Sequence, residues 1–387
     1  MPPEAPRIYL DNQATTRCDP RVVAAMLPFF SERFGNPHSA EHAMGHEAEA
    51  AVEAARGQVA ALLGADSREI IFTSGATEAN NLAIKGAAFH ALRFGDTRRR
   101  IVTVATEHKC VLESCADLAW SGFETVVVPV GADGLLNQAL LAEALLVPTL
   151  LVSVMAVNNE TGVIQDVAAL GAMARASGAL FHCDAAQAAG KIPVSLADTD
   201  LLSLSGHKMY GPKGIGALWV RRKPRVRLHP LLTGGSQERG LRAGTLPTAL
   251  IVGLGEAARL AVAEMAEESA RIGTLRDELL AKLRTGVEGL VLNGSAERRI
   301  AGNLNLTFPG VSAQELIRAC PDLCISTGSA CSSAAIEPSY VLRAMGLSPA
   351  RAGQTLRIGI GRFTSAPEID RAAEALISAW RTLLDKA

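Results

Sequence analysis

Short apolar runs alternate with stretches of helical periodicity through the first two thirds of the chain. The runs predict buried strands at residues 70–73, 101–105, 125–130, 150–157, 180–183, 201–204 and 215–220. Continuous apolar strands separated by helical stretches are typical of a mainly parallel sheet that helices cover on both faces. The pattern therefore predicts an α/β domain of the doubly wound type.

The pattern changes after Gly255. A long amphipathic helix is predicted over residues 256–284, followed by strand-like pieces at 303–308 and 356–360 and by a last helix. Ser365 and Glu368 form a capping box that predicts the start of that helix. We predict three parts: an N-terminal segment (1–15) that packs with the small domain, a large domain (16–259) and a smaller C-terminal α+β domain (260–387).

Composition narrows the choice of function. The 387 residues are 48% hydrophobic and 20% charged, which favours a large buried core over a disordered chain. The 38 basic and 39 acidic residues leave no electrostatic footprint for nucleic acid. No signal peptide or membrane span is evident, and the seven cysteines lack a disulfide-framework spacing. We expect a soluble cytoplasmic protein without membrane or direct nucleic-acid partners.

The strongest chemical signal is a lysine that directly follows a predicted strand. Lys208 ends the segment Ser205-Gly206-His207-Lys208, and a glycine-rich return leads into the next strand. A low-dielectric neighbourhood would lower the pKa of this amine from its reference value of about 10.4. The neutral amine attacks an aldehyde to form a Schiff base. A lysine alone in a turn is more often a solvated surface residue, so the assignment depends on the other motifs.

Three other motifs also follow predicted strands. Thr73-Ser74-Gly75-Ala76-Thr77 would direct backbone N–H groups and the Thr77 hydroxyl at a phosphate, Asp184 would pair with a pyridine nitrogen, and His108 lies at the same sheet edge. Taken alone, the first motif and Asp184 could instead be helix N-caps. Together with Lys208, the three motifs predict a pocket for pyridoxal phosphate (PLP).

These segments resemble the cysteine desulfurases, PLP enzymes of the class V aminotransferase group with fold type I. The resemblance runs in the expected order from about Tyr9 to Thr364. Besides the motifs above, it is carried by Tyr9-Leu10-Asp11-Asn12-Gln13-Ala14-Thr15-Thr16, Phe34-Gly35-Asn36-Pro37, Asn158-Asn159-Glu160-Thr161-Gly162, Gly234-Gly235-Ser236-Gln237-Glu238-Arg239-Gly240, Arg242-Ala243-Gly244-Thr245, Ser329-Ala330-Cys331 and Arg357. It implies a large PLP-binding domain and a small C-terminal domain that carries a mobile cysteine loop.

The resemblance implies roles for individual residues. Lys208 forms the Schiff base with PLP, Asp184 pairs with the pyridine nitrogen, and His108 stacks on the ring and acts as acid and base. The other expected cofactor contacts come from Ala76, Thr77, Asn159, Gln187, Ser205, His207 and, from the neighbouring subunit of a homodimer, Thr245. Arg357, together with Asn159, is expected to bind the substrate carboxylate, a task that suits a planar guanidinium.

Cys331 decides the reaction that the resemblance implies. It lies in a stretch of small residues that indicates a mobile loop. There it is expected to take the sulfur of L-cysteine as a persulfide, leave L-alanine, and pass the sulfur to an acceptor or iron–sulfur scaffold protein. A transient cluster shared between Cys331 and the scaffold is part of this expectation. The remaining cysteines are interpreted as small buried hydrophobes: Cys18, Cys110, Cys115, Cys183, Cys320 and Cys324.

Other interpretations stay open at this point. A selenocysteine lyase or another class V aminotransferase could use the same pocket, and a non-catalytic scaffold could carry an iron–sulfur cluster on the cysteines. His38, His42 and His46 are spaced four apart, as on one helix face; we favour a solvated face over a metal site. The basic run from Arg221 to Arg227 is interpreted as a solvated turn, with an acidic partner or a tRNA-bearing complex as the alternative.

Overall fold

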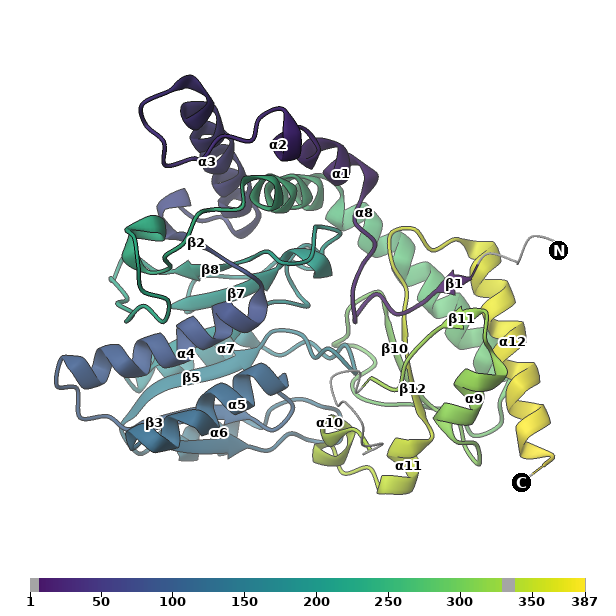
Figure 1. Cartoon of the computed structure of the whole chain (residues 1–387). Coiled ribbons are helices and arrows are strands. Elements are labelled where there is room, and N and C mark those ends of the chain that lie inside the picture. The colour runs from purple at the N-terminus through teal and green to yellow at the C-terminus, as the bar shows by residue number, and fades with distance from the viewer. Residues whose placement is uncertain (1–6, 329–337, 387) are drawn as a thin grey trace.

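The computed structural model describes residues 7–328 and 338–386. Its largest feature is a seven-stranded sheet in the order β2-β8-β7-β6-β5-β3-β4 (Figure 1). The strands are β2 (Ile70–Thr73), β3 (Arg100–Val104), β4 (Glu124–Val128), β5 (Thr149–Met155), β6 (Leu180–Asp184), β7 (Leu201–Ser205) and β8 (Gly216–Val220). In this sheet β8 pairs antiparallel with both its neighbours, β2 and β7, and the remaining neighbouring strands pair parallel. The predicted mainly parallel sheet is confirmed.

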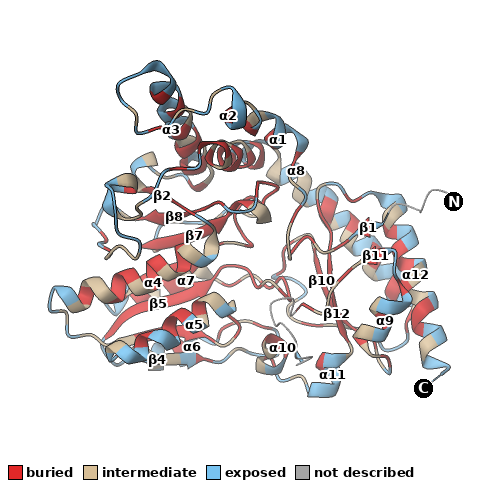
Figure 2. Ribbon diagram, viewed as in Figure 1, coloured by how far each residue is buried: buried red, intermediate tan, exposed pale blue. Residues whose placement is uncertain are grey.

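Side chains alternate between the two faces of this sheet, and each face has its own hydrophobic cluster. In β2, Ile70 and Phe72 belong to the first cluster and Ile71 to the second. Figure 2 shows buried residues along the strands and on the inner sides of the helices. The first cluster includes residues of α1 (Pro20–Met26), α3 (Ala43–Leu63), α6 (Gln138–Ala144), α7 (Val167–Ala176) and α8 (Thr248–Gly286), and the second includes residues of α4 (Ala76–Arg93) and α5 (Lys109–Asp117).

A smaller antiparallel sheet has the order β12-β10-β9, and a separate parallel pair joins β1 to β11. Ile8 and Leu10 share a third cluster with this sheet and with α12, whose predicted capping box of Ser365 and Glu368 is present. The remaining elements are β1 (Ile8–Tyr9), β9 (Val291–Leu292), β10 (Asn303–Thr307), β11 (Leu323–Cys324), β12 (Thr355–Gly359), α2 (Pro28–Ser31), α9 (Ala313–Ala319), α10 (Tyr340–Ala344), α11 (Pro349–Gly353) and α12 (Ala366–Leu384).

One helix, α8, runs from the large-sheet side of the molecule to the small-sheet side (Figure 1). Its 39 residues span about 58 Å at 1.5 Å per residue. The first part packs into the first cluster and the last part into the third. The helix begins earlier than predicted, since Gly253 and Gly255 lie inside it. These glycines allow close packing instead of ending the helix: a Cβ at Gly255 would lie 2.6 Å from Ala55 Cα. The predicted domain limits themselves stay a prediction.

The three histidines spaced four apart do not share a helix face. The helix begins at Ala43, and His42 is its N-cap, with Nδ1 accepting from Gly45 N at 3.1 Å. Among the described residues, no group of three or more His, Cys, Asp or Glu side chains is arranged to hold a metal ion. No helix within 7–328 or 338–386 is long and apolar enough to cross a membrane.

Candidate active site

A cavity of about 440 Å³ lies at the carboxyl ends of the parallel strands. This is the edge at which open α/β sheets bind ligands. The predicted cofactor and substrate residues that line it are Ala76, Thr77, His108, Asn159, Asp184, Gln187, Ser205, His207, Lys208 and Arg357. The fold therefore brings together side chains from segments that are far apart in the sequence.

The segment after β1 forms one wall of the cavity and holds the turn that carries Lys208. Lys208 Nζ donates to the backbone carbonyls of Gln13 and Ala14, both at 2.7 Å. Thr16 donates to the carbonyl of His207 through its backbone N–H at 2.9 Å and its hydroxyl at 3.0 Å. Gln13 and Ala14 also line the cavity, a role that the sequence motif around them did not reveal.

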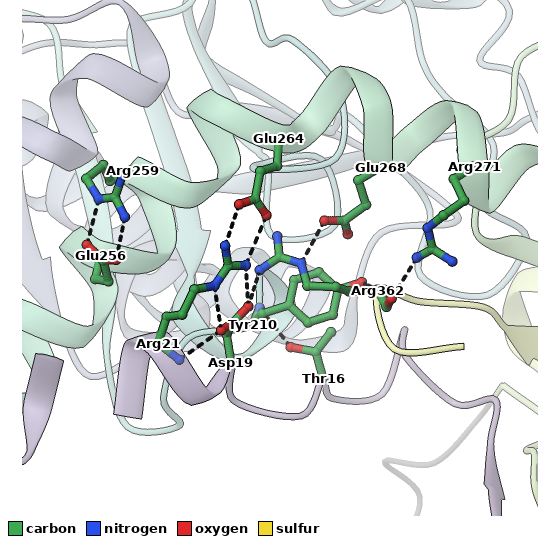
Figure 3. A network of polar contacts seen from close by, with 10 residues as sticks. All are labelled: Thr16, Asp19, Arg21, Tyr210, Glu256, Arg259, Glu264, Glu268, Arg271 and Arg362. Carbon is green, nitrogen blue, oxygen red and sulfur yellow. Dashed lines mark hydrogen bonds and ion pairs between the residues drawn. The ribbon is translucent and has the colours of Figure 1, made fainter. Parts of the chain in front are cut away.

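A second polar cluster, drawn in Figure 3, binds Tyr210, which lies two residues after Lys208. We call it the Arg362 network; it consists of Asp19, Arg21, Tyr210, Glu268 and Arg362. Arg362 binds Asp19 and Glu268, each at 2.7 Å, and its backbone N–H donates to Tyr210 Oη at 2.7 Å. Hydrogen bonds from Arg21 and Arg362 hold the pKa of Asp19 well below its usual range. Since Asp19 N also donates to the Tyr210 carbonyl, the network supports the chain just beyond Lys208.

The N-terminus of α4 forms a cradle for an anion at one end of the cavity. Gly75 precedes the helix with φ +153°, a conformation that favours glycine, and Ala76 and Thr77 start it. The first N–H groups of a helix have no partner inside the helix and favour negative charge. A Cβ at Gly216 would lie 2.7 Å from Gly75 Cα, so β8 also needs glycine beside the cradle. This end of the cavity fits a phosphate.

Asp184 presents a buried carboxylate at the end of β6. Its oxygens accept hydrogen bonds from Asn80 Nδ2 at 2.8 Å and from Ala186 N at 2.9 Å. The alternative that Asp184 caps a helix is wrong, because residues 186–190 form turns instead. His108 is the N-cap of α5, and burial lowers its pKa, aided by Lys208 and opposed by Asp184.

Arg357 is buried on β12, with 2% of its side chain exposed. Its Nη2 donates to Asp11 Oδ1 at 2.7 Å and its Nη1 donates to the carbonyl of Asn159 at 3.0 Å. These contacts fix the guanidinium plane at the cavity wall. The arrangement suits the binding of a carboxylate.

Five buried side-chain atoms of the described residues have no hydrogen-bond partner. They are Gln13 Oε1, Asn80 Oδ1, Glu107 Oε2, Asn159 Oδ1 and Arg357 Nε. Gln13, Asn159 and Arg357 line the cavity, and the other two residues contact its lining. An unpaired buried polar atom costs roughly 1–3 kcal/mol, so such a concentration of them indicates a site that a polar ligand completes.

Comparison with known proteins supports the family that the sequence resembles. The aminotransferase class-V family matches residues 8–372. This chain belongs to the class-V aminotransferase family. The predicted family and fold type are confirmed, and the family is one of PLP-dependent enzymes.

Individual members of the family are similar to this chain over nearly their whole length. A protein of Rickettsia bellii (strain OSU 85-389), named cysteine desulfurase IscS, is 52% identical over 380 residues, which is 98% of this chain and 92% of the relative. A solved NifS-like protein superposes with a TM-score of 0.89 at 36% identity, covering 97% of this chain and all of that one. SspA, solved in complex with cysteine, superposes with a TM-score of 0.80 at 38% identity, covering 92% and 99%.

Among the described residues of this chain, Thr245 is the one predicted site residue that does not line the cavity. Cys331 lies outside the described residues; Gly328, before it, lines the cavity. Thr245 is exposed on the segment between η4 (Gln237–Gly240) and α8. Arg242 anchors that segment to α4 through a 2.9 Å contact with Glu78.

The other cysteines divide into two groups. Cys115, Cys183 and Cys320 are buried, whereas Cys18, Cys110 and Cys324 are partly buried. Cys110 lines the cavity. Its interpretation as a small buried hydrophobe did not predict these polar surroundings. Its position two residues after His108, in the first turn of α5, is the signal that could have revealed them.

Proposed function

We propose that this member of the class-V aminotransferase family is a cysteine desulfurase, which moves the sulfur of L-cysteine to Cys331 and releases L-alanine. The observation that carries the proposal is one cavity in which Lys208, Asp184, His108 and Arg357 meet. Relatives named cysteine desulfurase, and the solved complex of SspA with cysteine, support this choice of substrate.

The cavity fits PLP as the cofactor. We propose that the phosphate is held by Ala76, Thr77, Ser205 and His207, the pyridine nitrogen by Asp184, the phenolic oxygen by Asn159 and Gln187, and the aldehyde carbon by Lys208. When bound, PLP supplies an electron sink for negative charge that develops on the substrate. The unpaired Oδ1 of Asn159 and the free first N–H groups of α4 are the features that such a ligand would satisfy.

The chain's own residues then divide the work. The Arg357 guanidinium binds the substrate carboxylate, with Asp11 fixing its plane. Lys208 Nζ moves the proton of the substrate Cα, and His108 Nε2 exchanges a proton at the substrate sulfur. The Cys331 thiolate attacks that sulfur; a new S–S bond forms as the Cβ–S bond breaks, and protonation of the carbon skeleton yields alanine. The atoms of cysteine are thereby divided between alanine and a persulfide.

We also propose a cytoplasmic homodimer with shared cavities. Thr245 is exposed outside the cavity of its own chain, as expected of a residue that contacts the phosphate of the neighbouring subunit. In the proposed division of the chain, residues 16–259 bind PLP and residues 260–387 carry Cys331. The persulfide then passes to an acceptor or an iron–sulfur scaffold protein, with Cys331 as a transient cluster ligand.

The test combines a spectrum with product analysis. The purified protein with PLP should absorb as a lysine-bound cofactor and should form equal amounts of alanine and transferable sulfur from L-cysteine. Cys331→Ser should keep the absorption and lose persulfide formation, whereas the matched control Cys320→Ser, at a buried site in the third cluster, should keep both. Persulfide transfer by Cys331→Ser would refute the assignment.

A further inference from the structure

Cys110 lies between two residues to which the proposed function gives chemical roles. Its Sγ is 3.0 Å from His108 Nδ1, and its backbone N–H donates to the same nitrogen at 3.2 Å. On the other side, Asn80 Nδ2 lies 3.2 Å from Cys110 Sγ and 2.8 Å from Asp184 Oδ2. A continuous chain of contacts therefore runs from Asp184 through Asn80 and Cys110 to His108.

The carboxylate at one end fixes the direction of the hydrogen bonds. Asp184 accepts, so Asn80 turns its amide NH₂ group toward it, and the Asn80 carbonyl oxygen is left unpaired. The same NH₂ group then donates to Cys110 Sγ. Because Sγ accepts from Asn80, the hydrogen of the Cys110 thiol is available to His108 Nδ1. A ring nitrogen that accepts carries no hydrogen, so neutral His108 carries its hydrogen on Nε2.

The charges around the pair are compatible with a neutral thiol next to a neutral imidazole. Burial raises the pKa of Cys110 to about 12, and Asp184 acts in the same direction, so the thiol keeps its hydrogen at neutral pH. The charged groups facing His108 are Asp184 at the end of β6, Lys208 after β7 and Lys109 on α5. Protonation of Nδ1 would require the thiol to turn its hydrogen away and would also cost the backbone N–H of Cys110 its acceptor.

We propose that Cys110 is a positioning residue for His108, whose thiol donates to Nδ1 and keeps the exchangeable hydrogen on Nε2. The catalytic meaning of this contact rests on the proposed function, which uses Nε2 for proton exchange with the substrate. The tautomer itself does not depend on that function. Cys110 thus acts through His108 and not as a second sulfur carrier.

Nuclear magnetic resonance of ¹⁵N-labelled histidine in the PLP-loaded protein tests the tautomer. His108→Gln assigns the signal. We expect an Nε2-protonated ring in the unaltered protein and in Cys110→Ser, which keeps a donor. In Cys110→Ala only the backbone N–H of residue 110 still donates to Nδ1, so the pKa of His108 should rise by roughly half to one unit and a fraction of the Nδ1-protonated form should appear. The matched control Cys115→Ala, at a buried site on α5 that does not line the cavity, should change neither.

Kinetics separate this proposal from the proposed function. The acidic limb of kcat/KM for alanine formation should move to higher pH in Cys110→Ala and return in Cys110→Ser. If Cys110→Ala does not fold, Cys110→Val fills the volume without a donor and gives the same test. An unchanged tautomer and titration in the variants without a donor would overturn the positioning role even if desulfuration is normal. Absence of desulfuration in the unaltered protein would instead refute the proposed function and leave the tautomer result unaffected.

Discussion

The turn that carries Lys208 adjoins two polar regions of opposite character. In the Arg362 network, charged side chains meet partners within the chain: buried Asp19 binds Arg21 and Arg362, and Arg362 also binds Glu268. In the cavity, Gln13, Asn159 and Arg357 each keep a buried polar atom without a partner. None of the unpaired atoms found among the described residues belongs to the network. The network is complete without a ligand and stabilises the fold, whereas the cavity is complete only with one.

The largest effect is expected from removing the amine on the cavity side of the turn. Lys208→Ala removes both the Schiff-base nitrogen and the proton carrier, so desulfuration should fall by roughly a thousandfold or more. The free energy of unfolding should fall by only about 1–3 kcal/mol, because two hydrogen bonds to the carbonyls of Gln13 and Ala14 are lost while the Arg362 network remains intact. Alanine production from cysteine and denaturant unfolding measure the two quantities. Activity within tenfold of the unaltered protein would contradict the site.

PLP should stabilise the cofactor-free protein by completing the cavity. At a concentration a thousand times its Kd, a ligand that binds the folded state alone adds about 4 kcal/mol to the free energy of unfolding. We expect thermal unfolding to move to higher temperature as PLP is added. Pyridoxal, which lacks the phosphate, is the control for the α4 cradle and should stabilise less. Equal stabilisation by both compounds would show that the cradle does not bind the phosphate.

Breaking the Arg362 network should cost stability. Arg362→Ala leaves Glu268 without the guanidinium that it binds and leaves Asp19 with Arg21 alone, and breaking a largely buried ion pair costs up to about 3–5 kcal/mol. Arg259→Ala is the matched control, since Arg259 is half-exposed and pairs with Glu256 on the same helix (Figure 3). That exposed pair should contribute less than about 1 kcal/mol. Equal losses in the two variants would contradict the contrast between the regions.

The smallest effect is a pH dependence that belongs to the network. The pKa of Asp19 is lowered in the folded state, so its contribution is present above the unfolded value of about 3.9 and is lost as the pH falls below it. Asp19→Asn should be less stable than the unaltered protein at pH 7 by about 1–2 kcal/mol. The difference should shrink below pH 4 in denaturant titrations. A difference that stays constant down to pH 2.5 would rule out this linkage.

The sequence predicts one of these regions far better than the other, for a physical reason. His108, Asp184 and Lys208 each follow an apolar strand, and parallel strands end at one edge, so their meeting is predictable. The Arg362 network joins residues 343 positions apart through side chains on a helix, a loop and a strand end, and no local pattern indicates such a pairing. Cys110 is an intermediate case, because its spacing from His108 is local while its contact with Asn80 depends on how α4 and α5 pack.

The unbroken course of α8 has a mechanical consequence. Because one continuous rod is embedded in the hydrophobic clusters at both ends, rotation of the small sheet relative to the large one would have to bend or break backbone hydrogen bonds within the rod. We therefore expect a substrate to enter by rearrangement of loops and side chains around the cavity, and not by movement of the small sheet away from the large one. The framework around Lys208 and Arg357 would then keep its dimensions through each turnover.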